Sequence, residues 1–131
     1  MSVGKIESEL KKYLSKKVKF AFLFGSALTK YFRPESDLDL AIYLGRKIQT
    51  QEFLHFKENL DEHFSNNYNF DLVLLDTADP IIAMQVLEAG KLLIKDDIDE
   101  FINYKARMIS QYIDFKMDRK IIEDSLAEGS I

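Results

Sequence analysis

The stretch FLFGSALTKYFRPESDLDLAIYL, residues 22–44, places a Gly-Ser pair ten residues before an Asp-x-Asp. Gly25 directly follows a run of aromatic and β-branched residues, residues 18–24, that is typical of a buried strand. Asp37 and Asp39 open a second apolar run, residues 37–44. Two carboxylates at the start of an otherwise apolar strand have two explanations, namely turn chemistry or a metal site.

The acidic pair is expected to lie on one face of its strand. The alternate positions on the opposite face are all apolar, namely Leu38, Leu40, Ile42 and Leu44. Strand geometry puts Asp37 and Asp39 about 7 Å apart along the chain, on the other face. Carboxylates that close repel each other, which raises the pKa of one of them unless a cation is present. Mg²⁺ commonly binds one or two protein carboxylates together with substrate phosphates and water. If this pair stood alone, the turn explanation, with Asp39 facing solvent, would be favoured.

The Gly-Ser pair is suited to binding a phosphate. Residues 27–32 are predicted to form a short helix capped by Ser26, with a turn at residues 33–36. A helix start presents unpaired N–H groups and the positive end of the helix dipole, and Gly25 allows the backbone to approach an anion closely. On its own this signal is weak, because a Gly-Ser at a helix start is more often only a cap.

A third acid, Asp71, enters the next predicted strand, residues 70–75 (FDLVLL). Taken alone, Asp71 could equally be an acid at a strand start that points to water. Three acids at the starts of two core strands, beside a helix start that can bind phosphate, are harder to explain separately. Together they supply the parts of a two-metal phosphoryl or nucleotidyl transfer site.

The remaining pattern predicts one α/β (or α+β) domain spanning residues 1–131. Apolar residues recur at helical spacing in residues 3–15, 50–64, 81–89 and about 97–126, and residues 92–94 could add a short strand. Gly90 is expected to close the helix over residues 81–89 as a C-terminal cap. The last helix is expected to carry a single apolar stripe, formed by Ile98, Phe101, Met108, Tyr112 and Phe115.

Composition excludes several classes of protein. The chain has 131 residues, a formal net charge of −4 and no cysteine, so neither a disulfide framework nor a thiolate metal site is possible. The acidic balance argues against direct nucleic-acid binding, which needs a clustered basic face. Apolar runs are too short to span a bilayer, and the N-terminal residues do not resemble a secretion signal, so a cytoplasmic location without membrane association is predicted.

Other charged and titratable residues are expected to have structural or surface roles. His55 and His63 lack metal-ligand spacing and are predicted to lie on the surface. Asp76 and Asp79 are predicted to be turn and cap residues, and the acids of residues 96–100 to complement a helix dipole. The lysines between residues 11 and 19 are predicted to form a solvated face.

The spacing of Gly25, Ser26, Asp37, Asp39 and Asp71 resembles that of nucleotidyltransferases of the DNA polymerase beta-like superfamily. The short chain, the helix before the first strand, and the segments at residues 86–94 and 108–126 are similar to minimal nucleotidyltransferase antitoxins of the MntA type. This resemblance covers nearly the whole chain, although its specific motifs lie in residues 22–44 and 70–75.

The resemblance implies a small mixed β-sheet flanked by helices, with a C-terminal helix. It also implies ATP as cosubstrate, two Mg²⁺ ions, and a hetero-oligomer with a HEPN-family toxin encoded nearby, as in type VII toxin–antitoxin pairs. Such antitoxins transfer AMP from ATP to a tyrosine of the toxin and silence its RNase activity. By the same resemblance, Gly25 and Ser26 would hold the triphosphate, while Asp37 and Asp39 would ligate the metals. Asp71 would complete one metal site and help to deprotonate the attacking hydroxyl.

The chain departs from the family pattern just after the Gly-Ser pair. Many members have Arg and Gly there, whereas this chain continues with Ala27-Leu28-Thr29-Lys30. Lys30 is the candidate for the basic contact to the triphosphate, and Arg33 is the alternative. Two other functions stay open: nucleotidyl transfer to a small molecule with a separate substrate-binding partner, and a non-catalytic module that neutralises its partner by binding alone.

Overall fold

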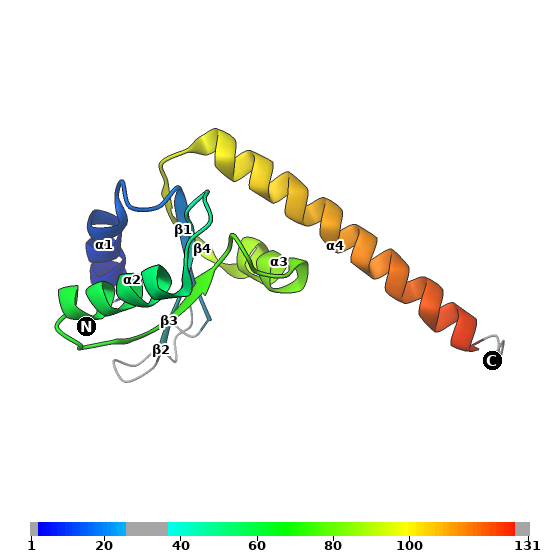
Figure 1. Cartoon of the computed structure of the whole chain (residues 1–131), viewed down its shortest axis with the longest axis horizontal. Helices are drawn as coiled ribbons and strands as arrows, with labels where there is room; N and C mark the ends of the chain where they lie inside the picture. The colour runs from blue at the N-terminus through cyan, green and yellow to red at the C-terminus, as the bar shows by residue number, and fades with distance from the viewer. Residues whose placement is uncertain (1–2, 26–36, 128–131) are drawn as a thin grey trace.

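Four helices and four strands make up the part of the chain that the computed structural model describes, residues 3–25 and 37–127 (Figure 1). In chain order they are α1 (Val3–Leu14), β1 (Phe20–Phe24), β2 (Asp37–Tyr43), α2 (Thr50–His63), β3 (Asn69–Leu74), α3 (Pro80–Ala89), β4 (Lys91–Lys95) and α4 (Ile98–Ala127). Each of these elements was predicted from the sequence, with boundaries that differ by at most two residues.

The strands form one sheet in the order β3-β2-β1-β4. β1 runs antiparallel to both β2 and β4, whereas β2 and β3 are parallel. The sheet is therefore mixed, as the resemblance implied. A parallel pair needs a long crossover connection, and α2 supplies it between β2 and β3.

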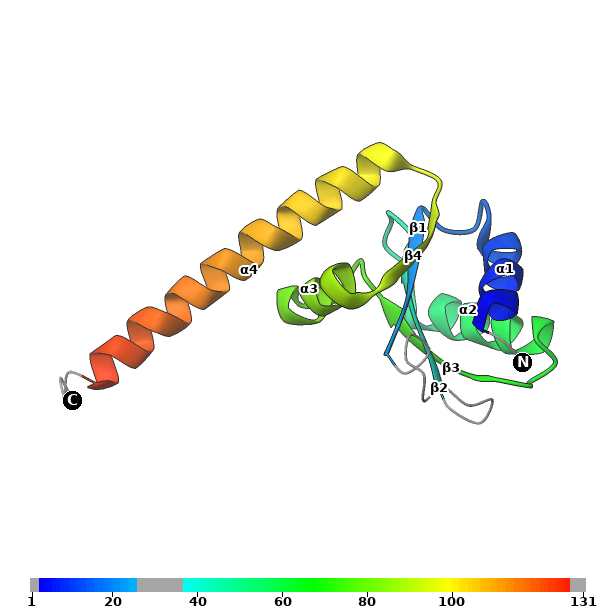
Figure 2. The same cartoon turned by 180° about the vertical axis from the view of Figure 1, so that it is seen from behind.

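Helices cover both faces of the sheet, with α1 and α2 on one side and α3 and α4 on the other (Figures 1 and 2). The alternation predicted for residues 37–44 is confirmed, because Leu38, Leu40 and Ile42 pack in the core under α1 and α2. Ala41 and Tyr43 pack in the core under α3 and α4. The sheet face that carries the odd-numbered residues of β2 is thus the face of α3 and α4.

Carboxylates cap the two helices of that second layer. Asp79 accepts a hydrogen bond from the backbone N–H of Ile82 at 2.9 Å, which confirms its predicted role as a cap. Asp97 accepts one from the backbone N–H of Glu100 at 3.0 Å, and this bond holds the pKa of Asp97 below its ordinary value. The predicted helix-start role of the acids in residues 96–100 agrees with this contact.

Gly90 ends α3 for a reason that the sequence did not predict. Its backbone is extended, with φ −76° and ψ 156°, so it is not the left-handed cap expected for a glycine at a helix end. Instead, a Cβ at this position would lie 2.5 Å from the carbonyl oxygen of Val86 and 3.2 Å from the ring of Phe22. Glycine is needed here because the chain passes close to both groups.

The predicted apolar stripe of the last helix is only partly correct. Met108 is buried, but Ile98 and Phe115 are 50% and 42% exposed. The most buried side chain of α4 is Tyr104, at 1% exposure, which the predicted stripe omitted. The difference arises because only the first part of α4 packs against α3 and the sheet, a limit that helical periodicity cannot indicate.

Tyr104 fixes α4 to the sheet. Its hydroxyl donates a hydrogen bond to the carbonyl oxygen of Leu75 at 2.8 Å, and its ring lies 4.9 Å from that of Tyr43 and 5.4 Å from that of Phe20 between centroids. Burial raises the pKa of the Tyr104 hydroxyl, since the charged phenolate would lose its water. The neutral, hydrogen-bonded phenol is therefore the form that the fold stabilises.

Removing this hydroxyl should weaken the fold measurably. We expect Tyr104→Phe to lower the free energy of unfolding in urea by about 1–2 kcal/mol, because the Leu75 carbonyl loses its buried donor. The pKa of Tyr104 is higher in the folded protein than in the unfolded chain, where it is about 10. The contribution of Tyr104 to the free energy of unfolding is therefore complete below about pH 10 and is lost as the pH rises above that value. Wild-type protein should therefore lose more stability than Tyr104→Phe between pH 9 and pH 11. An equal loss in both proteins would contradict this role.

Within the described ranges, none of the helices combines the length and apolar character needed to cross a membrane.

Candidate functional site

Two of the three predicted acids lie side by side on adjacent strands. In the parallel pairing of β2 with β3, Asp39 is the direct partner of Asp71, and in the antiparallel pairing of β1 with β2 it is the partner of Phe24. Residues paired in this way project from the same face of a sheet. Asp39 and Asp71 therefore share the face covered by α3 and α4. Asp39 is partly exposed and Asp71 is exposed, so a ligand can reach both.

Gly25 lies directly against Asp39 at the end of β1. Its φ of +75° is in the left-handed region that disfavours side chains. A Cβ at Gly25 would also overlap the carboxylate of Asp39. The chain thus leaves β1 through a conformation that brings its backbone into contact with the carboxylate. The close approach of Gly25 to a phosphate stays a prediction.

Of the other predicted site residues, the structure describes only the backbone of Asp37. Asp37 is the first residue of β2, with Asn69 as its partner on β3, but its side chain is outside the described part of the protein. Ser26, Lys30 and Arg33 also lie outside the described residues, as do the predicted short helix over residues 27–32 and the turn at residues 33–36. Their proposed contacts to ATP stay predictions. Among the side chains that are described, which do not include that of Asp37, no group of three or more acids or histidines could hold a metal ion.

Asp76, the acid that follows β3, is a structural residue. Its two carboxylate oxygens accept hydrogen bonds from the backbone N–H groups of Leu44 and Gly45, each at 2.8 Å. These bonds tie the loop after β2 to the end of β3. The predicted turn role of Asp76 is confirmed, but its partners, 32 and 31 residues away in sequence, could not be predicted because they depend on the pairing of the two strands.

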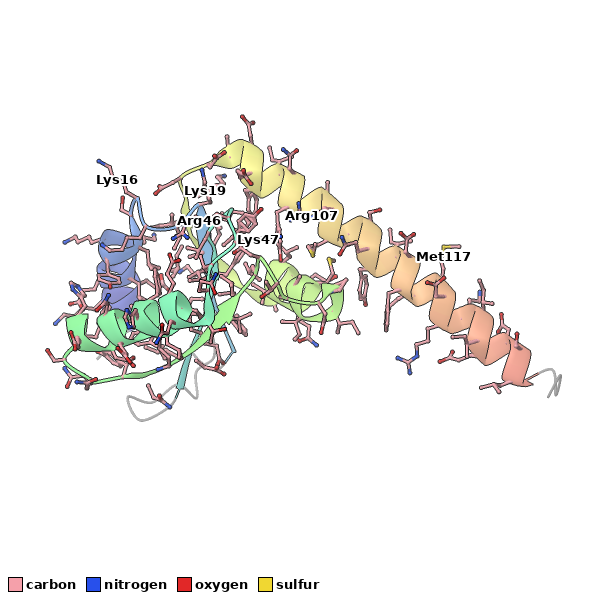
Figure 3. The ribbon with its side chains drawn as sticks, viewed as in Figure 1. Lys16, Lys19, Arg46, Lys47, Arg107 and Met117 are labelled. Carbon is pink, nitrogen blue, oxygen red and sulfur yellow. The ribbon has the colours of Figure 1, made fainter. Side chains whose placement is uncertain are left out.

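Basic side chains gather at the opposite end of the sheet from Asp39 and Asp71. Figure 3 shows Lys16, Lys19, Arg46, Lys47 and Arg107 around this end. Two cavities of about 530 and 660 Å³ lie here and share Arg46 in their lining. Two of these cations form ion pairs: Arg46 pairs with Glu52, and Nζ of Lys19 lies 3.5 Å from a carboxylate oxygen of Asp97. The lysines near the end of α1 are exposed, in agreement with the predicted solvated face.

His55 and His63 are exposed on α2, as predicted. The ring of His63 packs on that of Tyr13, with 4.4 Å between centroids. Both histidines belong to the layer of α1 and α2, on the other side of the sheet from Asp39 and Asp71, so they take no part in the acidic site.

The mixed sheet, with paired acids on neighbouring strands beside a glycine at a strand end, agrees with the class of protein that the sequence motifs predict, the nucleotidyltransferases. The sequence model of the polymerase beta nucleotidyltransferase family matches residues 5–99, which include every strand and all the predicted site residues. The chain belongs to this family.

Several solved structures have the same fold as this chain. A chain in a crystal structure of a toxin–antitoxin with AMP-PNP is 24% identical and superposes with a TM-score of 0.74 over 92% of this chain and 98% of its own. A chain of the tri-AMPylated HEPN toxin from Shewanella oneidensis in complex with its MNT antitoxin is 23% identical, with a TM-score of 0.72 over 95% and 98%. A chain of the MntA–HepT toxin–antitoxin is 22% identical, with a TM-score of 0.68 over 92% and 96%. No curated protein sequence matches this chain.

Proposed function

We propose that this protein is an antitoxin that transfers AMP from ATP to a hydroxyl of a HEPN-family toxin, most directly a tyrosine hydroxyl. The observation that carries this proposal is the register that places Asp39 beside Asp71, with the Gly25 backbone against Asp39. Membership of the polymerase beta nucleotidyltransferase family supports the reaction class. Cytoplasmic ATP would be the cosubstrate, which agrees with the location predicted from the sequence.

The similar structures support the choice of substrates. One of them contains the ATP analogue AMP-PNP, and another contains a HEPN toxin that carries three AMP groups. All three are complexes of a toxin with an antitoxin, and this chain has the same fold as a chain in each of them. We propose by analogy that this chain also acts within such a complex.

The residues present fit a site for Mg²⁺. Asp39 and Asp71 supply carboxylate oxygens, the ligands that Mg²⁺ prefers, and Asp37 precedes Asp39 by two residues in the same strand. The absence of a side chain at Gly25 allows the Asp39 carboxylate to lie where a Cβ would otherwise be, directly against the end of β1. We propose that Asp37, Asp39 and Asp71 together hold two ions. When bound, the ions would neutralise the phosphates of ATP and stabilise the charge that develops on them.

The residues of the chain then have distinct tasks. The oxygen of the acceptor hydroxyl forms a bond to the α-phosphorus of ATP while the bond from that phosphorus to the bridging oxygen of pyrophosphate breaks. Pyrophosphate leaves with the bonding electrons, and the hydroxyl proton passes to a carboxylate, for which we propose Asp71 because it is exposed. Gly25 and Ser26 hold the triphosphate through backbone and hydroxyl donors, and Lys30 neutralises part of its charge.

Two labels on ATP test this reaction. Purified protein is incubated with Mg²⁺ and the HEPN protein encoded beside it, using ATP that carries ³²P at the α or at the γ position. AMP transfer predicts that the HEPN protein acquires label from α-labelled ATP and none from γ-labelled ATP. Label from the γ position would instead indicate a kinase. If the two proteins bind each other and neither label is transferred, the binding-only alternative is correct.

A further inference from the structure

The end of α4 extends beyond α3 and the sheet (Figures 1 and 2). The helix has 30 residues and is therefore about 45 Å long. Its side chains in the core all come from its first part, namely Phe101, Tyr104 and Met108. Helices without tertiary contacts are only marginally stable in water, so a partner packed against the projecting end would stabilise it.

The apolar stripe that attaches α4 to the protein continues into this projecting end. Phe101, Met108, Phe115 and Ile122 follow one another at intervals of seven residues, which keeps them on one face with a drift of only about 20° per interval. Along this row the exposed fraction rises from 5% at Met108 to 42% at Phe115 and 61% at Ile122. One turn further, Leu126 is 55% exposed. The stripe thus presents an uncovered apolar surface where the protein body ends.

A groove runs along this stripe where α4 passes the start of α3. It has a volume of about 380 Å³, and its apolar lining is formed by Ile81, Tyr112 and Phe115. Cations exceed anions along it, because Lys116, Arg119 and Lys120 line it together with a single carboxylate, Glu123. The complementary ligand is a helix with an apolar stripe flanked by carboxylates, because such a helix satisfies both the groove and its basic edges.

This surface lies on the same side of the sheet as the acidic pair. α3 and α4 cover the face from which Asp39 and Asp71 project, while α1 and α2 cover the other face. A protein bound along the stripe would therefore be held on the side of the sheet where the proposed reaction takes place. Such placement raises the effective concentration of an acceptor hydroxyl at the acids.

We propose that the face of α4 formed by Phe115, Ile122 and Leu126, together with Ile81 of α3, is the surface on which the HEPN partner docks through an acidic, amphipathic helix. This inference rests on the proposed function. It is supported by the similar structures, which cover 92–95% of this chain. The unmatched part is shorter than residues 109–127 of α4, so at least part of the projecting end has a counterpart in chains that were crystallised in toxin–antitoxin complexes.

The test compares two aspartate substitutions in the same segment of α4. Ile122→Asp places a charge on the proposed surface. Met117→Asp places one on the side of α4 that faces away from α3 (Figure 3), about 140° around the helix from Ile122. The two side chains are almost equally exposed, at 61% and 59%, so neither change should disturb the fold. Leu126→Asp serves as a second variant on the surface, and circular dichroism checks that all three remain helical.

Binding of the full-length HEPN protein is measured by titration calorimetry. We expect Ile122→Asp and Leu126→Asp each to weaken binding at least about 30-fold, the effect of losing a central apolar contact, and Met117→Asp to bind as wild type does. The KM for the HEPN protein in AMP transfer should rise in parallel, while the affinity for ATP stays unchanged. Wild-type affinity in both surface variants would overturn the proposal.

The same variants distinguish failure of the docking proposal from failure of the proposed AMP transfer, and they distinguish HEPN binding from dimerisation of this chain. If the surface variants lose binding although the wild type transfers no AMP, docking is supported and the proposed reaction fails. If light scattering shows a dimer of this chain alone that Ile122→Asp dissociates without weakening HEPN binding, the surface belongs to a second copy of this chain and the proposal is wrong.

Discussion

Asp39→Asn is expected to reduce AMP transfer to the HEPN protein by about a thousandfold or more while leaving the fold intact. Asp39 is the central acid of the proposed site, because it pairs with Asp71 across the sheet and contacts the backbone of Gly25. An amide keeps the shape of the side chain but removes the negative charge that would bind Mg²⁺. Losing one preorganised electrostatic contact in an active site typically costs a factor of 10²–10³, and losing a metal ligand also weakens binding of the ion.

The matched control is Asp99→Asn, which removes the same charge from an exposed acid in the first turn of α4. Single-turnover rates, measured with saturating ATP and HEPN protein, should fall only for Asp39→Asn. Thermal unfolding should show that both variants remain folded. Equal rates for Asp39→Asn and wild type would exclude Asp39 from the metal site.

Gly25→Ala should abolish transfer to a similar extent, for a steric reason. The added methyl group would overlap the Asp39 carboxylate, so either the carboxylate or the end of β1 must move. The φ of +75° adds backbone strain of about 1–2 kcal/mol for a residue with a side chain. Misplacement of a catalytic group by about 1 Å can cost a factor of 10² in rate, and here both the carboxylate and the proposed triphosphate contact are displaced.

Gly45→Ala is the control that separates the effect of backbone strain from the effect of steric overlap with Asp39. Gly45 has the same φ of +75°, but a Cβ there would lie 3.2 Å from Cγ of Lys19, a flexible side chain that can move aside. We therefore expect Gly45→Ala to lose about 1–2 kcal/mol in the free energy of unfolding, measured in urea, because of the backbone strain. Gly25→Ala should lose at least as much, because the overlap with Asp39 adds to the strain. Only Gly25→Ala should also lose AMP transfer. If Gly45→Ala loses as much activity, the effect of Gly25→Ala comes from stability and not from contact with Asp39.

Local patterns in the sequence predicted the elements of this fold because their signals are themselves local. The alternation of residues 37–44 indicated which side chains of β2 face α1 and α2, and the structure places Leu38, Leu40 and Ile42 there. The capping role of Asp79 was similarly visible, since a cap contacts a backbone N–H only three residues away. These features depend on helix and strand geometry within a few residues.

Long-range geometry could not be read from such patterns. The sequence indicated that Asp39 and Asp71 begin neighbouring strands, but their direct pairing depends on a parallel register set across α2. The contact between Gly25 and Asp39 depends in turn on how β1 pairs with β2. The resemblance to a known family supplied the mixed sheet, which the apolar patterns alone do not specify.

Burial along α4 shows a further limit of periodic patterns. The seven-residue spacing predicts one continuous apolar face, whereas the structure covers that face only as far as Met108. A helix that continues beyond its domain has the same sequence pattern as one that is buried throughout. The uncovered part, from Phe115 to Leu126, is explained in this account by a partner protein.

We have proposed that Asp37, Asp39 and Asp71 form a site that transfers AMP to a HEPN partner. The most direct test is the intact mass of the HEPN protein after incubation with ATP, Mg²⁺ and either wild-type protein or the double variant Asp37→Asn/Asp39→Asn. Wild-type protein is expected to add the mass of one or more AMP groups to the HEPN protein, and the double variant to add none. AMP addition by the double variant, or no addition by wild type that forms the complex, would contradict this proposal.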